Sequence, residues 1–289
     1  MQQWLIPAKT FLLGEYAALQ NGRAILLTTS PCFEIKVSET LGFSGVHLES
    51  PAGKLWSHYG INEYGLTWHD PYAGCGGLGA SSAQFLGAYF AITAQRGQKS
   101  NVQELLELFW RFAWNGTGIR PSGYDIIAQS LSNCVFINGT DAPSNNSPWP
   151  FEDLGFIIVH TGNKLPTHLH LQQTPPIKEI DTLNQLVIQA EDSFQSNNSL
   201  GLISAVNSYY QSLLQMQLVS VNTQRIITDL ASENIILAAK GCGAMGEDTI
   251  LVLLDKRNFD SVTELFHNKK LKILATNNNL FQNLITSNS

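Results

Sequence analysis

The chain has 289 residues, of which 44% are hydrophobic and 14% are charged, and its formal net charge is −6. This length and apolar content can bury substantial cores and predict two coupled domains. The acidic balance, with no dense basic run, argues against nucleic acid as the main partner. No apolar run reaches the roughly 18 residues that span a bilayer, and the first residues do not resemble a signal peptide, so we expect a cytoplasmic protein without a membrane partner. The isolated cysteines indicate neither a disulfide framework nor a Cys-x-x-Cys metal site.

The N-terminal segment places one cation, Lys9, between a proline turn at Pro7 and an apolar run. A lone lysine is usually a solvated charge, so this residue predicts little by itself. Further on, Phe33, Ile35 and Val37 alternate with more polar residues, which predicts a strand over 33–37.

A glycine-rich turn leads straight into an apolar, helix-like segment that ends near Gln95. Glycines allow close backbone approach to a ligand, and the first N–H groups of a helix point at an anion with the helix dipole behind them. We therefore expect a phosphate-binding loop formed by Gly76, Gly77, Leu78, Gly79, Ala80, Ser81 and Ser82. The alternative is an ordinary loop followed by an N-capped helix. The spacing matches neither the Walker motif nor the dinucleotide-binding motif.

A second turn, over residues 120–125, contains proline and glycine and ends in an acid, Asp125. Before it, apolar residues over 102–112 follow helical spacing, and after it residues 135–137 read as a strand. The segment 138–150 is rich in asparagine, serine and proline, which is typical of a loop, and we expect the two domains to meet there.

The remaining segments alternate between strand and helix patterns. We expect strands over 156–159, 250–254 and 271–275 and helices over 183–194, 226–231 and 259–267, as in an α+β sandwich. A third glycine-containing segment, 240–248, directly precedes the strand at 250–254, which implies another close approach of the backbone.

Three segments in this order resemble the motifs of the GHMP kinases, the family of galactokinase, homoserine kinase, mevalonate kinase and phosphomevalonate kinase. Residues 7–16 are similar to Pro-Gly-Lys-x-x-Leu-x-Gly-Glu-His/Tyr, with Ala8 in place of glycine. Residues 77–82 resemble Gly-Leu-Gly-Ser-Ser-Ala, and residues 243–248 resemble Gly-Ala-Gly-Gly-Gly-Asp/Gly. The resemblance implies an α+β fold of two domains, a ribosomal-protein-S5-like domain over 1–150 and a ferredoxin-like domain over 151–289.

The resemblance also implies an ATP- and Mg²⁺-dependent kinase that acts on a small anionic acceptor as a monomer or homodimer. Lys9 and Asp125 would be catalytic, with Asp125 orienting the acceptor hydroxyl and Lys9 keeping that carboxylate ionised. Ser81 falls on the family's metal-facing serine. Beside the first loop, the nucleotide phosphates would contact Gly243, Ala244 and Gly246. The acceptor would contact Glu15, Tyr16, Arg120, Ser122, Gly123 and Lys164.

The acceptor stays open between mevalonate and phosphomevalonate, both in isoprenoid precursor biosynthesis. Tyr16 and the Thr-Gly-x-Lys segment at 161–164 are similar to the phosphomevalonate kinase branch, whereas residues 121–125 are similar to mevalonate kinase. Trp114 stands where mevalonate kinases carry a magnesium-binding glutamate, so Mg²⁺ would be held by phosphates, Ser81 and water. The alternatives are another GHMP-type kinase with a sugar or amino-alcohol acceptor, or a catalytically weak nucleotide- or metabolite-binding protein on this scaffold.

Overall fold

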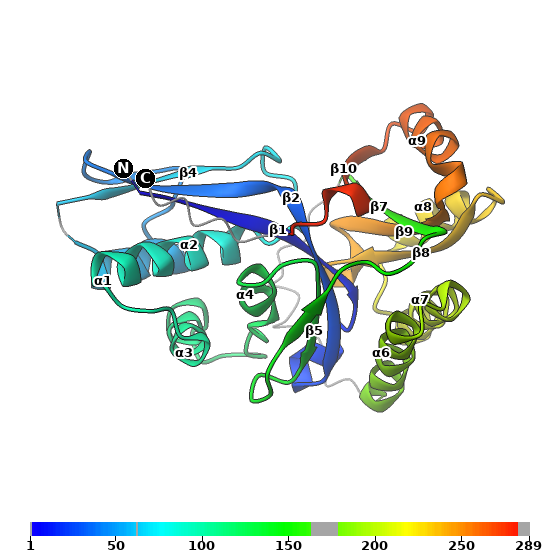
Figure 1. The fold of residues 1–289 in the computed structure, drawn as a ribbon, viewed down its shortest axis with the longest axis horizontal. Coiled ribbons are helices and arrows are strands. Elements are labelled where there is room, and N and C mark those ends of the chain that lie inside the picture. Colours follow the sequence, from blue (N-terminus) through cyan, green and yellow to red (C-terminus); the bar gives the residue numbers. More distant parts are fainter. Residues whose placement is uncertain (1, 62, 163–178, 283–289) are drawn as a thin grey trace.

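The computed structural model describes residues 2–61, 63–162 and 179–282, and it is built on two β-sheets (Figure 1). The first sheet has six strands in the order β3-β4-β2-β5-β6, with β1 also pairing with β2. The long antiparallel pair of β1 and β2 is the spine of this sheet. Its strands are β1 (Gln3–Leu13), β2 (Arg23–Ser38), β3 (Phe43–Ser44), β4 (Gly65–His69), β5 (Cys134–Asn138) and β6 (Asn145–Ser147).

The helices that follow these strands in the first half of the chain lie on one side of the sheet in Figure 1. The central one, α2, is apolar almost all round and is therefore buried between the strands and the other helices. The amphipathic helix α3 begins at an asparagine cap, since the Asn101 side chain accepts from the Glu104 backbone N–H at 3.0 Å. The helices are α1 (Pro51–Tyr59), α2 (Ala80–Gln95), α3 (Val102–Ala113) and α4 (Tyr124–Gln129), and a short 3-10 turn, η1 (Ala17–Gln20), follows β1.

The second sheet has four antiparallel strands in the order β10-β7-β9-β8. In chain order this is 4-1-3-2, with helices in both crossovers, which is the ferredoxin-like arrangement. Helices α6 and α7 lie below the sheet in Figure 1 and α9 lies above it. The strands are β7 (Leu154–His160), β8 (Ile236–Cys242), β9 (Thr249–Asp255) and β10 (Lys272–Thr276); the helices are α6 (Ile180–Gln195), α7 (Ser199–Gln215), α8 (Val221–Ala231) and α9 (Phe259–Asn268).

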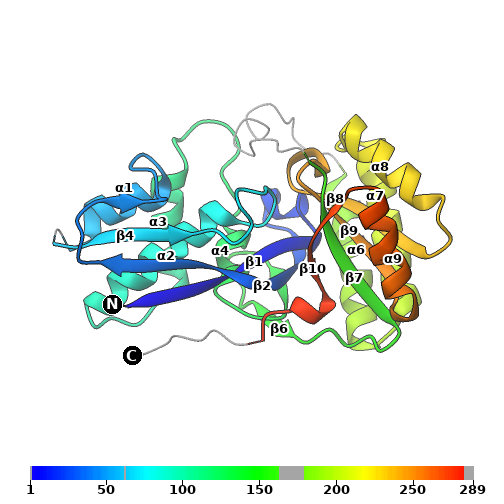
Figure 2. The same cartoon turned by 90° about the horizontal axis from the view of Figure 1, so that it is seen from above.

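The chain crosses between the two sheets more than once. After β10 it turns through η4 (Asn277–Asn279) and returns to the first sheet, as Figure 2 shows from above. There the backbone N–H of Phe281 donates to the carbonyl of Thr28 at 2.9 Å, and its carbonyl accepts from Asn133 N–H at 2.7 Å. Leu280 and Phe281, which follow the second sheet in the chain, are therefore hydrogen-bonded to the first one.

The predicted α+β fold is confirmed, and each predicted strand and helix coincides with an observed element of the same type, except that the strand predicted over 271–275 begins one residue before β10. The prediction of a turn at Pro7 is wrong, because Pro7 lies inside β1 at a register shift, where a strand tolerates a residue without an N–H. The segment 138–150 is not loop throughout, since it contains β6. Elements without a clear periodic signal were missed, namely β1, β4, β8, α1, α4 and α7.

The limits 1–150 and 151–289 stay a prediction, although the first sheet takes its strands from residues 3–147 and the second from residues 154–276. Within the described ranges, every helix is too short or too polar to cross a bilayer. Lys164 lies outside the described residues.

Candidate active site

A lysine and a carboxylate from distant parts of the chain form an ion pair at the centre of the site. Lys9 Nζ lies 2.8 Å from Asp125 Oδ1. The lysine side chain is 9% exposed, whereas the aspartate side chain is 36% exposed, so the carboxylate is the member that a small molecule can reach. Strand β1 supplies the lysine and the first turn of α4 supplies the acid.

The short helix α4 is anchored by the tyrosine that precedes this acid. Tyr124 is fully buried, and its hydroxyl donates to the carbonyl of Gly22 at 2.6 Å. Burial raises the pKa of Tyr124 to about 12, so the hydroxyl keeps its proton and stays a donor. The first turn of α4 is thereby fixed to the residue that directly precedes β2, the strand that pairs with β1.

The glycine-rich loop is attached directly to the strand that carries Lys9. The backbone N–H of Lys9 donates to the carbonyl of Leu78 at 3.0 Å. Gly79 has φ +80°, and a Cβ there would lie 2.9 Å from Lys9 Cε and 3.0 Å from Gln129 Nε2. Only glycine fits this position, because a side chain would require a strained backbone and would displace the lysine. The loop therefore reaches the ion pair by close backbone approach.

The loop ends at Gly79, the N-cap of α2, and the first turn of this long helix presents unpaired N–H groups. At its start, Ser81 is exposed, whereas Ser82 is buried. The Ser82 hydroxyl donates to Gln129 Oε1 at 2.7 Å and also lies 2.9 Å from the Gly79 carbonyl. Of the two predicted serines, Ser81 has a hydroxyl available to a ligand, whereas Ser82 supports the loop.

Gln129 is a site residue that sequence reasoning missed. It is fully buried, and its amide nitrogen donates to the carbonyls of Pro7 at 2.8 Å and Gly79 at 3.1 Å. One side chain thus ties β1, the glycine-rich loop and α4 together. Its spacing of four residues from Asp125 would have indicated it, since residues at i and i+4 share a helix face.

The third motif meets the glycine-rich loop at Gly77. A Cβ at this glycine, which has φ +81°, would lie 2.7 Å from Cβ of Asp248 and 3.0 Å from Cγ2 of Thr249. Asp248 is buried, and it ends the turn that contains Gly243, Ala244 and Gly246. The structure therefore brings three sequence motifs and Asp125 together: Lys9 touches Gly79, and Gly77 touches the turn after β8.

In the segment before Asp125, the guanidinium of Arg120 stacks on the Trp110 ring, 4.0 Å from its centroid. The Trp110 indole donates to the Pro121 carbonyl at 2.8 Å, which fixes the turn before Asp125. In the same turn, the Ser122 hydroxyl accepts from Tyr124 N–H at 3.3 Å, and Gly123 is the N-cap of α4. These contacts fix the turn that leads into α4.

Glu15 and Tyr16 are held between the sheets. The Glu15 carboxylate pairs with Lys240 Nζ at 2.8 Å, and its side chain is 7% exposed. The buried Tyr16 hydroxyl accepts from Met245 N–H at 3.1 Å and lies 3.4 Å from the Leu218 carbonyl. Their predicted contact with the acceptor stays a prediction.

The described residues hold no cluster of three or more His, Cys, Asp or Glu side chains that could bind a metal ion. Trp114 caps the C-terminus of α3, and its indole donates to the Thr117 carbonyl at 3.0 Å. A magnesium ion that keeps most of its waters needs few protein ligands, and the exposed Ser81 hydroxyl fits such a site.

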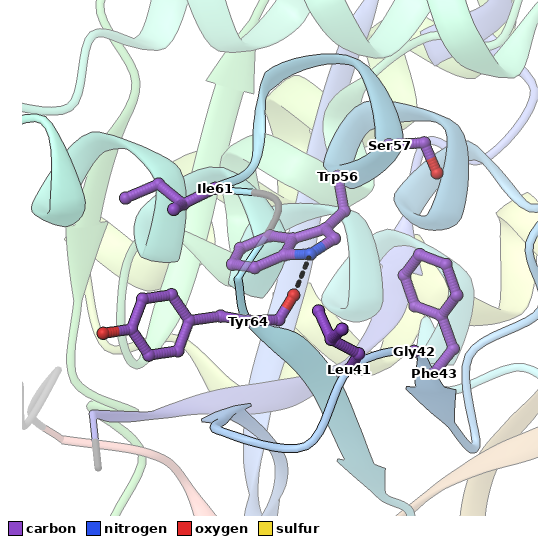
Figure 3. Close-up of a pocket in the computed structure, with 7 residues that line it drawn as sticks. All are labelled: Leu41, Gly42, Phe43, Trp56, Ser57, Ile61 and Tyr64. Atoms are coloured by element: carbon purple, nitrogen blue, oxygen red, sulfur yellow. Dashed lines mark hydrogen bonds between the residues drawn. The ribbon is translucent and has the colours of Figure 1, made fainter.

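A pocket of about 240 Å³ lies elsewhere, beside α1 and the start of β4 (Figure 3). In it the Trp56 indole donates to the Tyr64 carbonyl at 3.3 Å. The first residue of β4 pairs with Ser38, whereas Lys9 pairs with Thr28, ten residues along β2. At about 3.3 Å per residue, the pocket lies roughly 30 Å along the strand from the ion pair and is not part of the site.

No protein-family model matches the chain, and no curated protein sequence matches it either. Solved structures match over nearly the whole chain. Methanococcus jannaschii mevalonate kinase is 15% identical, with TM-score 0.73, and the match covers 97% of this chain and 98% of that one.

Streptococcus pneumoniae phosphomevalonate kinase, in complex with phosphomevalonate and AMPPNP, is 13% identical, with TM-score 0.77, and the match covers 96% of this chain and 99% of that one. Lactococcus lactis galactokinase, complexed with galactose, is 12% identical, with TM-score 0.76, and covers 98% and 93%. These three proteins act on different acceptors, so the shared fold does not identify the acceptor here.

Proposed function

We propose that this chain, which has the two-domain fold of the GHMP kinases, transfers the γ-phosphoryl group of ATP to a small anionic acceptor. Mevalonate and phosphomevalonate, both in isoprenoid precursor biosynthesis, are the first acceptors to test. The observation that carries the proposal is the Lys9–Asp125 ion pair at 2.8 Å, with the loop before α2 packed against its lysine.

Phosphoryl transfer passes through a loose transition state, so positioning and charge stabilisation dominate its catalysis. Alignment of two reactants can supply about 7–11 kcal/mol, whereas a positioned base contributes roughly 10²–10⁴-fold in rate, or about 3–5 kcal/mol. The backbone N–H groups of the loop and of the first turn of α2 would bind the phosphates of ATP. We therefore expect the loop to contribute at least as much as Asp125.

The exposed carboxylate of Asp125 would accept or orient the proton of the acceptor hydroxyl. The hydroxyl oxygen forms a bond to the γ-phosphorus, the bond from that phosphorus to the bridging oxygen breaks, and ADP leaves. Lys9 would stabilise negative charge on the transferred group, because its ammonium lies beside the same carboxylate. If the acceptor oxygen belongs to a phosphate, no strong base is needed and Asp125 would act mainly by orientation.

Ser81 would hold Mg²⁺ together with the nucleotide phosphates and water. When bound, the ion would neutralise charge on the phosphates. Trp114 offers no carboxylate at the position where mevalonate kinases carry one, so this metal would have fewer protein ligands than in those enzymes.

Arg120 favours an anionic acceptor. Its guanidinium is held on the Trp110 ring at 4.0 Å, five residues before Asp125, and it forms no ion pair with a carboxylate of the described residues. An exposed guanidinium that is held by an aromatic ring in the turn before Asp125 would suit a phosphate or a carboxylate of the acceptor.

The test is an ADP-release assay with Mg²⁺-ATP and a panel of mevalonate, phosphomevalonate, galactose and homoserine. Turnover with one mevalonate compound that is lost in Asp125→Asn and in Lys9→Met supports the proposal. Turnover with galactose or homoserine, lost in the same variants, would support another GHMP-type kinase and would contradict the proposed acceptor.

A second candidate function is nucleotide or metabolite binding without efficient catalysis. It is favoured by Trp114, whose indole is hydrogen-bonded within its own turn at the family's metal-ligand position. Departures at Ala8, Ala80, Met245 and Glu247 point the same way. No turnover across the panel, with ATP binding detected by calorimetry, would favour this function over the kinase.

A further inference from the structure

A second lysine–carboxylate pair is sealed between the two sheets. Lys240 Nζ lies 2.8 Å from Glu15 Oε1, and the two side chains are 0% and 7% exposed. Burial by itself would lower the pKa of Lys240, but Cys242 and the Glu15 carboxylate outweigh it and the pKa is raised. The ammonium is therefore charged, and the pair is a true ion pair inside the protein.

The two ends of this pair belong to the two halves of the candidate site. Glu15 lies two residues beyond the end of β1, the strand that carries Lys9. Lys240 lies in β8, three residues before Gly243, where the turn that contacts the glycine-rich loop begins. The pair thus joins the end of the strand that carries Lys9 to the end of β8, directly before the Gly243–Asp248 turn.

Two neighbouring contacts reinforce the same connection. The Cys242 thiol donates to the carbonyl of Phe11 at 3.3 Å, so β8 is also attached to β1. One residue after Glu15, the Tyr16 hydroxyl accepts from the backbone N–H of Met245, in the middle of the turn. The Gly243–Asp248 turn is consequently fixed both at its start, through β8, and at its middle, through Met245, by residues in or next to β1.

We propose that Glu15 and Lys240 are positioning residues that set the Gly243–Asp248 turn against the glycine-rich loop. This proposal rests on the proposed kinase function. Stability does not explain the pair, since a buried ion pair can often be replaced by apolar side chains without loss of stability. A buried ion pair holds its two groups at a defined distance and orientation, however. Here it would fix the position of the Gly243–Asp248 turn relative to the glycine-rich loop.

The experiment compares Glu15→Gln, Lys240→Met and the double variant Glu15→Met/Lys240→Met. The single variants leave one group buried without its partner and should unfold at lower denaturant concentration, whereas the double variant should recover most of that loss. We expect the double variant to keep a KM for ATP raised at least ten-fold, with kcat changed by less than three-fold. Amides of residues 243–248 should exchange with solvent at least ten-fold faster than in the natural protein.

Wild-type KM and wild-type exchange at 243–248 in a stable double variant would overturn the proposal, because the pair would then be only a packing element. If that variant does not fold, Lys240→Arg serves instead. It keeps the charge but changes the direction of the donors, so it should raise KM and exchange rates, and unchanged values would overturn the proposal.

A matched control is available in the pair of Arg23 and Glu191, which joins β2 to α6 with Arg23 Nη1 2.6 Å from Glu191 Oε2. It also links the first sheet to an element of the second half, but neither residue adjoins the turn. Glu191→Gln should leave KM and exchange at 243–248 unchanged. Exchange needs no acceptor and no ATP, so it tests the positioning proposal even if the protein phosphorylates nothing in the panel.

Discussion

The two lysine–carboxylate pairs have the same separation and opposite surroundings. Lys9 and Asp125 lie 2.8 Å apart with side chains 9% and 36% exposed, and Lys240 and Glu15 lie 2.8 Å apart with side chains 0% and 7% exposed. In the first pair the carboxylate reaches the surface. In the second pair both groups are enclosed between the sheets.

Because of this difference, the Asp125 carboxylate is accessible to a small molecule, whereas the Glu15 carboxylate can contact only other parts of the protein. In the first pair water reaches the Asp125 carboxylate but hardly the Lys9 ammonium, so this pair should contribute less to stability than a pair with both groups enclosed. A buried pair contributes through its geometry and is costly when one partner is removed, because the other charge is left in the interior. Substitutions at the Lys9–Asp125 pair should therefore affect activity more than stability, and substitutions at the Lys240–Glu15 pair should affect stability more than activity.

The largest expected effect is on turnover at the open pair. Asp125→Asn should lower kcat by roughly 10²–10⁴-fold if the acceptor is a hydroxyl, because in the proposed mechanism the carboxylate would accept the proton. The free energy of unfolding should fall by less than the roughly 3–5 kcal/mol of a fully buried pair, because water reaches position 125 and the Asn amide oxygen still faces Lys9. Steady-state kinetics and urea unfolding measure the two quantities. Unchanged turnover would remove Asp125 from the mechanism.

The next effect is on stability at the sealed pair. Lys240→Met should lower the free energy of unfolding by about 3–5 kcal/mol, since the Glu15 carboxylate stays buried without its partner. Urea unfolding followed by tryptophan fluorescence measures it, with Glu191→Gln as the control at a more accessible pair. A loss below about 1 kcal/mol would mean that water reaches the Glu15 carboxylate, and the contrast between the pairs would disappear.

A smaller effect is expected at the side chain that supports the open pair. Gln129→Ala should lower the free energy of unfolding by about 1–3 kcal/mol, because the carbonyls of Pro7 and Gly79 lose their buried donor. It should also raise the KM for ATP, since Gly79 begins α2. Ser130→Ala, one residue along on a partly exposed side chain, is the matched control. Equal effects in both variants would contradict the assigned role.

The smallest effect concerns a third lysine, Lys272, which lies opposite His160 in the β7–β10 pair. Burial, and then the charge of Lys272, lower the pKa of His160 below its usual 6.5. The unfolded chain therefore binds this proton more readily, so the contribution of His160 to stability is present above pH 6.5 and falls as the pH drops through the folded pKa. An NMR titration should show the pKa of His160 rising in Lys272→Met, and no rise would leave burial as the sole cause.

Much of the fold could be predicted from local pattern, because amphipathic stripes and apolar runs report which residues face a core. The strand at 250–254 and the helix at 259–267 were found this way. Strand β1 was missed because Pro7 reads as a turn, although the register shift at that residue accommodates it. Helix α4 has six residues, too few for periodicity to indicate it.

The candidate site, like the fold, was predicted where the signal is local and missed where it depends on distant residues. Lys9, Asp125 and the glycine-rich loop were predicted because their residue types and spacing carry chemistry. The partners Gln129 and Lys240 were not, since a buried polar side chain is defined by groups far away in the sequence, such as the carbonyl of Pro7 or the carboxylate of Glu15. The spacing of four residues places Gln129 on the same helix face as Asp125, but no local pattern indicates the distant carbonyls to which it donates.

The return of the chain to the first sheet has a consequence for biosynthesis. Phe281 bonds to Thr28, and Thr28 is the residue that faces Lys9 across the β1–β2 pair. A ribosome makes Thr28 long before it makes Phe281, the residue that bonds to it. The nascent N-terminal half must therefore leave this edge open to solvent or to a chaperone until residue 281 emerges, and a chain truncated before that point would present an unpaired strand edge.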